Sequence, residues 1–334
     1  MKIIARMLFV LLVTTGSVQA RDMEITPFRT INQSPLTRIF GVPVETASTI
    51  TPEKSTSFNF TQDIASSYAI ESIPGEKIIL DGESYVWTLA ARYGVGNRFE
   101  AGINLPVVLD GGGFFDGFIV DWHNSFSLPQ GGRDTAPKDR LRYSYSKNGV
   151  EKLRMDHSSV GIGDISFHGG MRLYDSQEDN SHDSLALRGS LKLPTGDSGS
   201  LRGSGSTDFT VSLCGSMNNF TEWGSLGLFA SLGAMAMTNG DVLRDQQNNF
   251  AGFGTAGVGW GPAEWISFKI QLNGNTSLYH DTSLNALSDG SLMLVSGGAL
   301  KLGGGYVLDI GVSEDVAVST APDVSLHFGL SKRF

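Results

Sequence analysis

The sequence predicts an all-β fold, a closed antiparallel transmembrane β-barrel of about twelve strands, with ten to fourteen strands compatible with the pattern. Three observations predict it: long segments of alternating apolar and polar residues, connections that alternate between short and long, and an N-terminal export signal. The predicted parts are a signal peptide (1–20), an N-terminal segment (21–51) and the barrel (52–334), which includes a long extracellular loop (110–157).

The first residues, MKIIARMLFVLLVTTGSVQA, give the export signal. Lys2 and Arg6 precede an apolar run over 7–13, and the small residues around Ala20 form a cleavage site. A helix that spans a membrane needs about 20 apolar residues, so this run is too short to be an anchor. The mature chain is therefore expected to begin near Arg21.

Composition excludes several classes of protein. Removing Lys2 and Arg6 with the signal peptide leaves 23 basic against 34 acidic residues, a net charge of −11, so nucleic acid is not an expected partner. Cys214 is the single cysteine, which precludes an internal disulfide in an exported protein.

The final segment shows the alternation most clearly. Val324, Leu326, Phe328 and Leu330 share one face, while polar residues and glycine occupy the other. The same period of two appears over 99–105, 185–193, 266–273 and 306–313. Strands of about ten residues can cross a bilayer, and a sheet in lipid must close on itself to pair its backbone. The chain also ends on an aromatic residue, so we expect Leu326, Phe328, Leu330 and Phe334 to form a C-terminal assembly signal.

The connections support the same topology. Short turns are expected at 94–97, 218–220, 260–265 and 303–305, and long links at 110–157, 195–203, 239–248, 281–290 and 315–322. Brief periplasmic turns and longer extracellular loops are typical of outer-membrane barrels, and here both chain ends are periplasmic. The acidic link over 175–184 departs from this pattern, because it is long but falls on the periplasmic side.

Several charged residues are predicted to point into the lumen, an unusual feature of an acidic protein. They are Arg92, Glu100, His168, Arg172, Arg188 and Lys192. Two interpretations remain open: a salt-bridged network around Glu100 that fills a small lumen, or a pathway for anions.

The stretch FFDGFIVDWHNSF (114–126) fits a helix better than a strand. At 100° per residue its large apolar side chains fall within an arc of about 100°; they are Phe115, Phe118, Ile119, Trp122 and Phe126. The helix is predicted either to lie on the outer membrane surface or to fold inward and cap the mouth. Asp121 and Ser125 are each two residues from His123, about 200° around the axis, so no catalytic pair is expected within the helix.

No other motif indicates chemistry. The six histidines are scattered, and no metal, cofactor or catalytic signature is recognised. The segment over 21–51 lacks alternation, so it is either a slack leader or a plug that folds into the lumen.

The runs over 31–43, 82–134, 159–170 and 191–208 resemble a bacterial family of predicted outer-membrane proteins known only as a domain of unknown function. The resemblance implies a barrel in the bacterial outer membrane, but no substrate, cofactor or catalytic residue. The expected partners are outer-membrane lipid, lipopolysaccharide, the barrel-assembly machinery and a small solute. Three functions are considered: passage or binding of the solute through a constricted lumen, an enzyme that acts on lipid, and a structural envelope protein.

Overall fold

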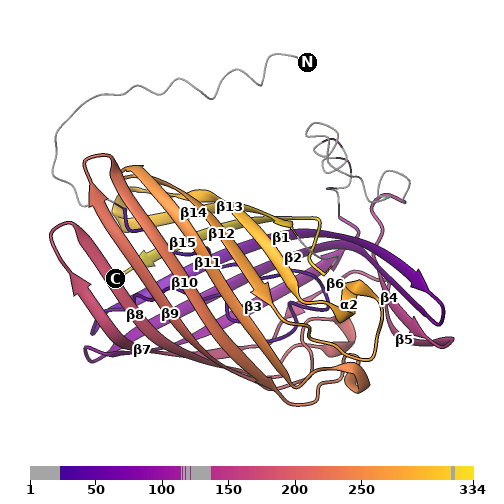
Figure 1. Ribbon diagram of the computed structural model, residues 1–334. Coiled ribbons are helices and arrows are strands. Elements are labelled where there is room, and N and C mark those ends of the chain that lie inside the picture. The colour runs from indigo at the N-terminus through magenta and orange to yellow at the C-terminus, as the bar shows by residue number, and fades with distance from the viewer. Residues whose placement is uncertain (1–22, 114, 116, 118–120, 122–136, 317–319) are drawn as a thin grey trace.

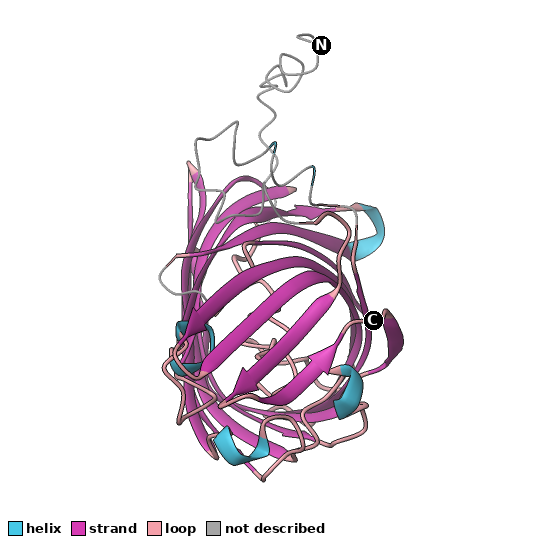
Figure 2. Cartoon of the chain, turned by 90° about the vertical axis from the view of Figure 1, so that its right-hand side faces the viewer, coloured by secondary structure: helices cyan, strands magenta, loops and turns pink. Residues whose placement is uncertain are grey.

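The computed structural model describes residues 23–113, 115, 117, 121, 137–316 and 320–334. They form a closed antiparallel barrel, as predicted (Figures 1 and 2). Its twelve strands are β1 (Thr56–Ile73), β2 (Glu76–Val95), β3 (Phe99–Gly111), β7 (Ser166–Gln177), β8 (Ser181–Lys192), β9 (Asp208–Thr221), β10 (Gly224–Met237), β11 (Phe250–Ala263), β12 (Ile266–Asn275), β13 (Ser291–Lys301), β14 (Tyr306–Asp315) and β15 (Val324–Arg333). Pairing of β1 with β15 closes the ring.

Short turns gather at one end of the barrel, at 96–98, 178–180, 222–223, 264–265 and 302–305. This is the periplasmic end in outer-membrane barrels, and both chain ends of the barrel lie there. The acidic link expected over 175–184 is in fact a short turn, because β7 and β8 continue their ladder as far as Gln177 and His182. Among the described residues, the connections follow the alternation except at 74–75, where a two-residue turn joins β1 to β2 at the extracellular end.

The long links carry structure of their own at the extracellular end. The hairpin of β4 (Arg142–Lys147) and β5 (Val150–Met155) pairs with the start of β2, and β6 (Ser159–Ile162) pairs with the end of β3. The single-turn helix α2 (Asn285–Ser288) lies between β12 and β13. Among the described residues, no helix is long and apolar enough to cross a membrane.

The helix predicted in the long loop lies largely outside the described residues. Phe118, Ile119, Trp122 and Phe126 are not described. Phe115 is described, and its backbone N–H donates to the Glu83 carboxylate (2.5 Å).

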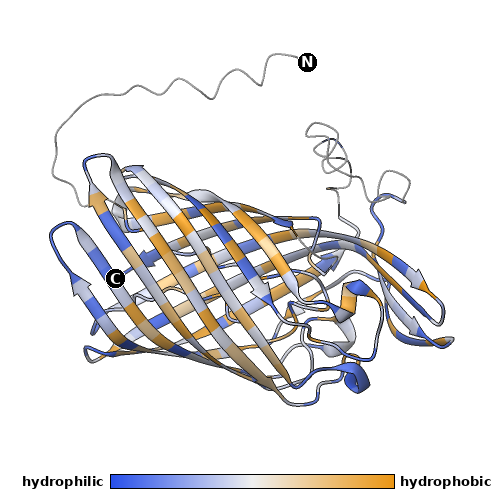
Figure 3. Ribbon diagram, in the orientation of Figure 1, coloured by the Kyte–Doolittle hydropathy of each residue, from blue (hydrophilic) through white to orange (hydrophobic). Residues whose placement is uncertain are grey.

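Hydrophobic residues are spread along the strands of the barrel (Figure 3), and many large apolar side chains are exposed on its outer surface. On β9, for example, Phe209, Val211 and Leu213 are exposed, while Thr210 and Ser212 between them are buried. Side chains that alternate in this way place apolar groups toward lipid and polar groups toward the lumen.

The last strand completes this surface at the seam. Phe328, Leu330 and Phe334 are exposed on the outside. Backbone hydrogen bonds join Phe334 to Thr56 in both directions, and the Phe334 ring meets the Phe58 ring edge to face at 5.9 Å between centroids. The C-terminal residue therefore contributes directly to closure of the ring.

Candidate functional site

Residues 23–51, here called the lumen segment, lie inside the barrel, where Figure 2 shows loops within the ring of strands. The first half of the lumen segment contacts polar side chains of the wall. The Ile25 N–H donates to Asn218 Oδ1 (2.9 Å), and the Phe28 N–H donates to Gln271 Oε1 (2.7 Å). Further along, Thr30 Oγ1 donates to an Asp63 carboxylate oxygen (2.7 Å).

The second half of the lumen segment returns toward the periplasmic end along other strands. The Gly41 N–H donates to Asp208 Oδ2 (2.7 Å), and Ser48 Oγ donates to Ser216 Oγ (2.7 Å). The Thr51 N–H donates to Glu100 Oε2 (2.6 Å). The chain thus enters and leaves the lumen at the same end, and polar groups of the wall pair its backbone at both limbs.

Glycines in the wall allow the lumen segment to approach closely. A Cβ on Gly94 would lie 2.6 Å from Thr51 O, and one on Gly227 would lie 2.3 Å from Ile25 Cβ. Real Cβ atoms do not come so near to other heavy atoms, so a side chain at either position would displace the segment. The abundance of glycine in this chain therefore has a structural cause at the lumen face.

Two of the predicted lumen charges form the central contact of the site. Arg188 Nη1 donates to Glu100 Oε1 (2.5 Å), and both residues are 6% exposed. The same guanidinium donates to the Ala47 and Thr49 carbonyls (2.5 and 2.9 Å). Because Glu100 also accepts from Thr51, this ion pair fastens the returning limb of the lumen segment to β3 and β8.

Three other residues of the predicted lumen cluster form contacts of their own elsewhere on the lumen face. Arg92 donates to Asn104 Oδ1 (2.7 Å), and His168 Nε2 is 2.8 Å from Ser166 Oγ. Lys192 forms a separate cluster with Asp164 and Asp208, at 2.6 and 3.2 Å.

Arg172 does not join Glu100. It lies at the periplasmic mouth, where it pairs with Asp175 (3.2 Å). A bulge between Arg172 and Tyr174 shifts the register of β7 against β8 at this point. A strict period of two cannot anticipate such a shift.

Several lumen contacts were not predicted. Ion pairs join Arg29 to Glu45 (2.8 Å) and Arg38 to Asp110 (2.7 Å), and each begins on the lumen segment. On the opposite wall, Lys269 pairs with Asp309 (2.5 Å) and His327 with Asp63 (2.8 Å). The wall residues of these pairs lie on the polar face of alternating strands, so the alternation could have predicted that they face the lumen. The lumen segment has no such alternation, so its partners could not be predicted in this way.

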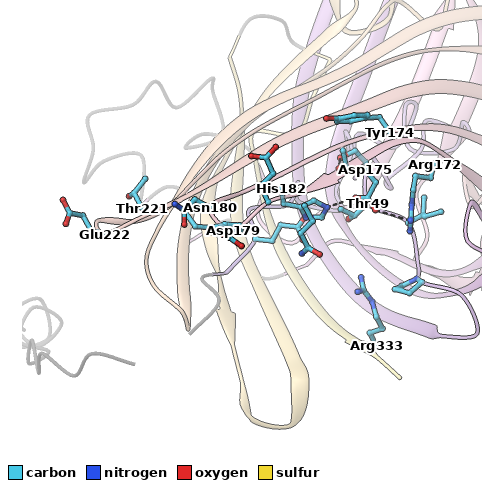
Figure 4. A pocket seen from close by; sticks show the side chains of 18 residues that line it. Thr49, Arg172, Tyr174, Asp175, Asp179, Asn180, His182, Thr221, Glu222 and Arg333 are labelled. Carbon is cyan, nitrogen blue, oxygen red and sulfur yellow. Dashed lines mark hydrogen bonds and ion pairs between the residues drawn. The ribbon is translucent and has the colours of Figure 1, made fainter. Parts of the chain in front are cut away.

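The lumen segment divides the periplasmic mouth into two vestibules. The acidic vestibule, about 1090 Å³, contains more carboxylates than cations, and Figure 4 shows His182 and Asp175 beside Thr49 and Arg172. Its charged lining residues are Glu24, Asp175, Glu178, Asp179, Glu222, Arg172 and Arg333. The basic vestibule, about 450 Å³, contains Arg29, Arg92, Arg188, Lys301, Lys332 and Arg333 against Glu24, Glu45, Glu100 and Asp309.

A smaller cavity of about 110 Å³, the inner cavity, lies between the lumen segment and the wall formed by β2, β3, β7 and β8. Its lining includes Asn104, Ser166, His168 and Lys192. Among the described residues, it shares no lining residue with either vestibule.

The extracellular end is covered by an apolar cap, a buried cluster built from the turn of the lumen segment, the β4–β5 hairpin and the loops around 242 and 284. Leu36, Ile39 and Phe40 are its members from the lumen segment. Tyr279 in the cap donates its hydroxyl to Leu36 O (3.0 Å), and its ring meets Phe40 edge to face. Burial raises the pKa of the Tyr279 hydroxyl above its usual value, so the donor stays protonated.

Within the part of the chain that the structure describes, no three His, Cys, Asp or Glu side chains are grouped to hold a metal ion. The described polar groups of the lumen instead form ion pairs and hydrogen bonds with one another and with the lumen segment.

The closed ring, the apolar outer belt and the polar lumen define a transmembrane β-barrel of the outer-membrane class. The chain belongs to the family described as "Protein of unknown function (DUF3187)", which matches residues 3–334. No curated protein matches its sequence significantly.

The chain is similar to several solved structures, one of which shares its fold at a TM-score above 0.5. The COG4313 outer membrane channel from Pseudomonas putida F1 is 14% identical, with a TM-score of 0.55 over 86% of this chain and 98% of that one. LpxR from Salmonella typhimurium is 7% identical (TM-score 0.41, 84% and 99% covered), and the toluene transporter TbuX from Ralstonia pickettii is 9% identical (TM-score 0.36, 84% and 90% covered).

Proposed function

We propose that this protein is a non-enzymatic outer-membrane channel for a small solute, which the lumen segment closes and opens. The observation that carries the proposal is the position of residues 23–51, which occupy the lumen and contact the wall through polar groups. Export through the signal peptide, with cleavage near Ala20, forms part of the same proposal.

The contacts suit a segment that moves. When the lumen segment withdraws, each neutral hydrogen bond to the wall exchanges for one to water, so each contributes only about 0.5–1.5 kcal/mol net. The buried Arg38–Asp110 ion pair is the stronger contact that withdrawal must break. The lumen segment also contributes Leu36, Ile39 and Phe40 to the apolar cap. Its withdrawal would therefore loosen the extracellular closure and clear the lumen in one movement.

The likeness to the Pseudomonas putida channel supports passage of a solute, because that protein is described as a channel and has the same fold. This support is an analogy of fold, since one fold hosts many functions. The position of the lumen segment inside the barrel is the stronger support for the proposal.

A reversible crosslink tests the proposal. Ser48 Oγ lies 2.7 Å from Ser216 Oγ, so thiols introduced at the two positions would lie side by side. In a Cys214→Ala background, Ser48→Cys with Ser216→Cys would join the lumen segment to β9. We expect single-channel conductance in a planar bilayer when the pair is reduced, and its loss when the pair is oxidised.

The matched control joins two wall strands instead. Ser184 and Ser216 are 3.0 Å apart, so Ser184→Cys with Ser216→Cys adds a disulfide but leaves the lumen segment free. The oxidised control should conduct like the reduced protein. If the oxidised Ser48→Cys, Ser216→Cys variant conducts as well as the oxidised control, the lumen segment is not a gate that must move.

A further inference from the structure

We infer that the inner cavity is a binding site for a small neutral molecule with an apolar body and a hydroxyl or amide end. The inference rests on the proposed function in one respect, since the site would be a stopping point for the solute on its way through the lumen. The binding itself follows from the walls of the inner cavity and is tested without conduction.

An apolar strip lines one side of the inner cavity. Val86 on β2 and Val108 on β3 are direct partners across the ladder, and both are buried on the lumen face. Val42, Pro43 and Val44 of the lumen segment line the cavity as well. Aliphatic groups on both the wall and the lumen segment favour a ligand with a short hydrocarbon part.

The charges around the inner cavity are already paired. Arg38 contacts both oxygens of Asp110 (2.8 and 2.7 Å). Lys192 contacts Asp164 and Asp208. An ionic ligand would add an uncompensated charge to a buried site, which is costly. The site therefore selects against ions.

Two lining residues carry buried polar atoms with unused hydrogen-bonding capacity. Gln33 is 3% exposed, and among the described residues its Oε1 atom has no hydrogen-bond partner. Nε of Arg38 is likewise without a partner there. Because the first atom accepts and the second donates, a hydroxyl or amide end of a ligand that reaches either atom can satisfy it.

The volume limits the size of the ligand. A water molecule occupies about 30 Å³ in the liquid, and an engineered apolar cavity of about 150 Å³ accommodates benzene. The inner cavity, at about 110 Å³, is smaller than the benzene cavity, so about six non-hydrogen atoms is the upper limit for its ligand.

Butyramide and butyrate form a matched pair of probes, because they have the same number of non-hydrogen atoms and differ in charge. Saturation-transfer NMR on the full chain in detergent reports their binding. We expect butyramide to bind at least tenfold more tightly than butyrate. Equal binding of the two, or no binding of butyramide, would overturn the inference.

Neighbouring valines provide the matched variants. Val108→Phe fills the inner cavity, whereas Val107→Phe adds the same bulk on the lipid side, where Val107 is exposed. Butyramide binding should fall at least tenfold in the first variant and stay unchanged in the second. If Val108→Phe does not fold, Val108→Leu takes its place with a smaller loss expected, and an unchanged affinity in the folded variant contradicts the site.

A third variant tests the polar end. Gln33→Leu keeps a similar volume but removes the unpaired acceptor, so it should weaken the binding of butyramide severalfold; unchanged affinity would argue against this contact.

The proposed gate and the proposed binding site can be refuted separately. If the Ser48–Ser216 disulfide leaves conduction unchanged while butyramide still binds, only the proposed gate is refuted. If the disulfide blocks conduction but butyramide does not bind, only the proposed binding site is refuted.

Discussion

Arg188 on β8 and Glu100 on β3 form their ion pair across β7, because the residue between them in the register is Gly170. A Cβ on Gly170 would lie 2.8 Å from Glu100 Cγ. The absent side chain thus lets two strands that are not neighbours share a contact, and the lumen segment joins both partners.

Glu100→Gln should lower the unfolding midpoint, because the variant leaves the buried Arg188 without its counter-ion. Breaking a buried pair in this way costs about 3–5 kcal/mol. Thermal unfolding in detergent measures the change, with Glu222→Gln in a periplasmic turn as the control.

The same Glu100 variant separates the two interpretations of the charge cluster. A structural network predicts the lower midpoint with little change in ion preference, whereas an anion pathway predicts stronger anion preference in a bilayer with little loss of stability. A variant that shifts neither property would show that Glu100 and Arg188 are not paired.

Gly170→Ala should also destabilise the barrel, by about 1–3 kcal/mol, because the added methyl group displaces Glu100. Gly169→Ala is the matched control, since the nearest atom to its Cβ would be 4.0 Å away. Chemical unfolding of the two variants in parallel measures their stabilities. Equal unfolding midpoints would contradict the finding that the Arg188–Glu100 ion pair passes over Gly170.

The sequence predicts the barrel and part of the site for a clear physical reason: alternation places Glu100 and Arg188 on the lumen face. It fails for Arg172, because a bulge is a local event that a period of two does not encode. It could not decide between a leader and a plug for 21–51, because contacts such as Phe28 with Gln271 join residues 243 positions apart. The apolar cap could not be predicted from the sequence either, because its residues come from segments that are far apart in the chain.

Tyr279→Phe should loosen the apolar cap by about 0.5–1.5 kcal/mol, because Leu36 O loses its donor. The pKa of Tyr279 is raised in the folded state, so its contribution is present below the unfolded pKa of about 10 and is lost as pH rises further. Wild-type stability should therefore fall more steeply above pH ~10 than that of the variant. Tyr174→Phe, at an exposed site, is the control, and parallel pH profiles of wild type and Tyr279→Phe would contradict the buried donor.

Deletion of Phe334 should reduce the folded yield in the membrane, because the residue pairs with Thr56 and packs on Phe58 at the seam. Heat-modifiable migration in detergent gels measures the folded fraction. Phe250→Ala removes another exposed aromatic side chain away from the seam and should fold normally. A full yield of the deletion variant would show that closure does not depend on Phe334.

The most direct test of the lumen segment as the closure is the conductance of a variant that lacks residues 23–51, compared with the full chain in the same planar bilayer. Heat-modifiable migration first confirms that the variant forms a barrel. We predict a steady open conductance, several times that of the full chain, because the variant has an emptied lumen and an apolar cap without Leu36, Ile39 and Phe40. A folded variant whose conductance equals that of the full chain would contradict the account.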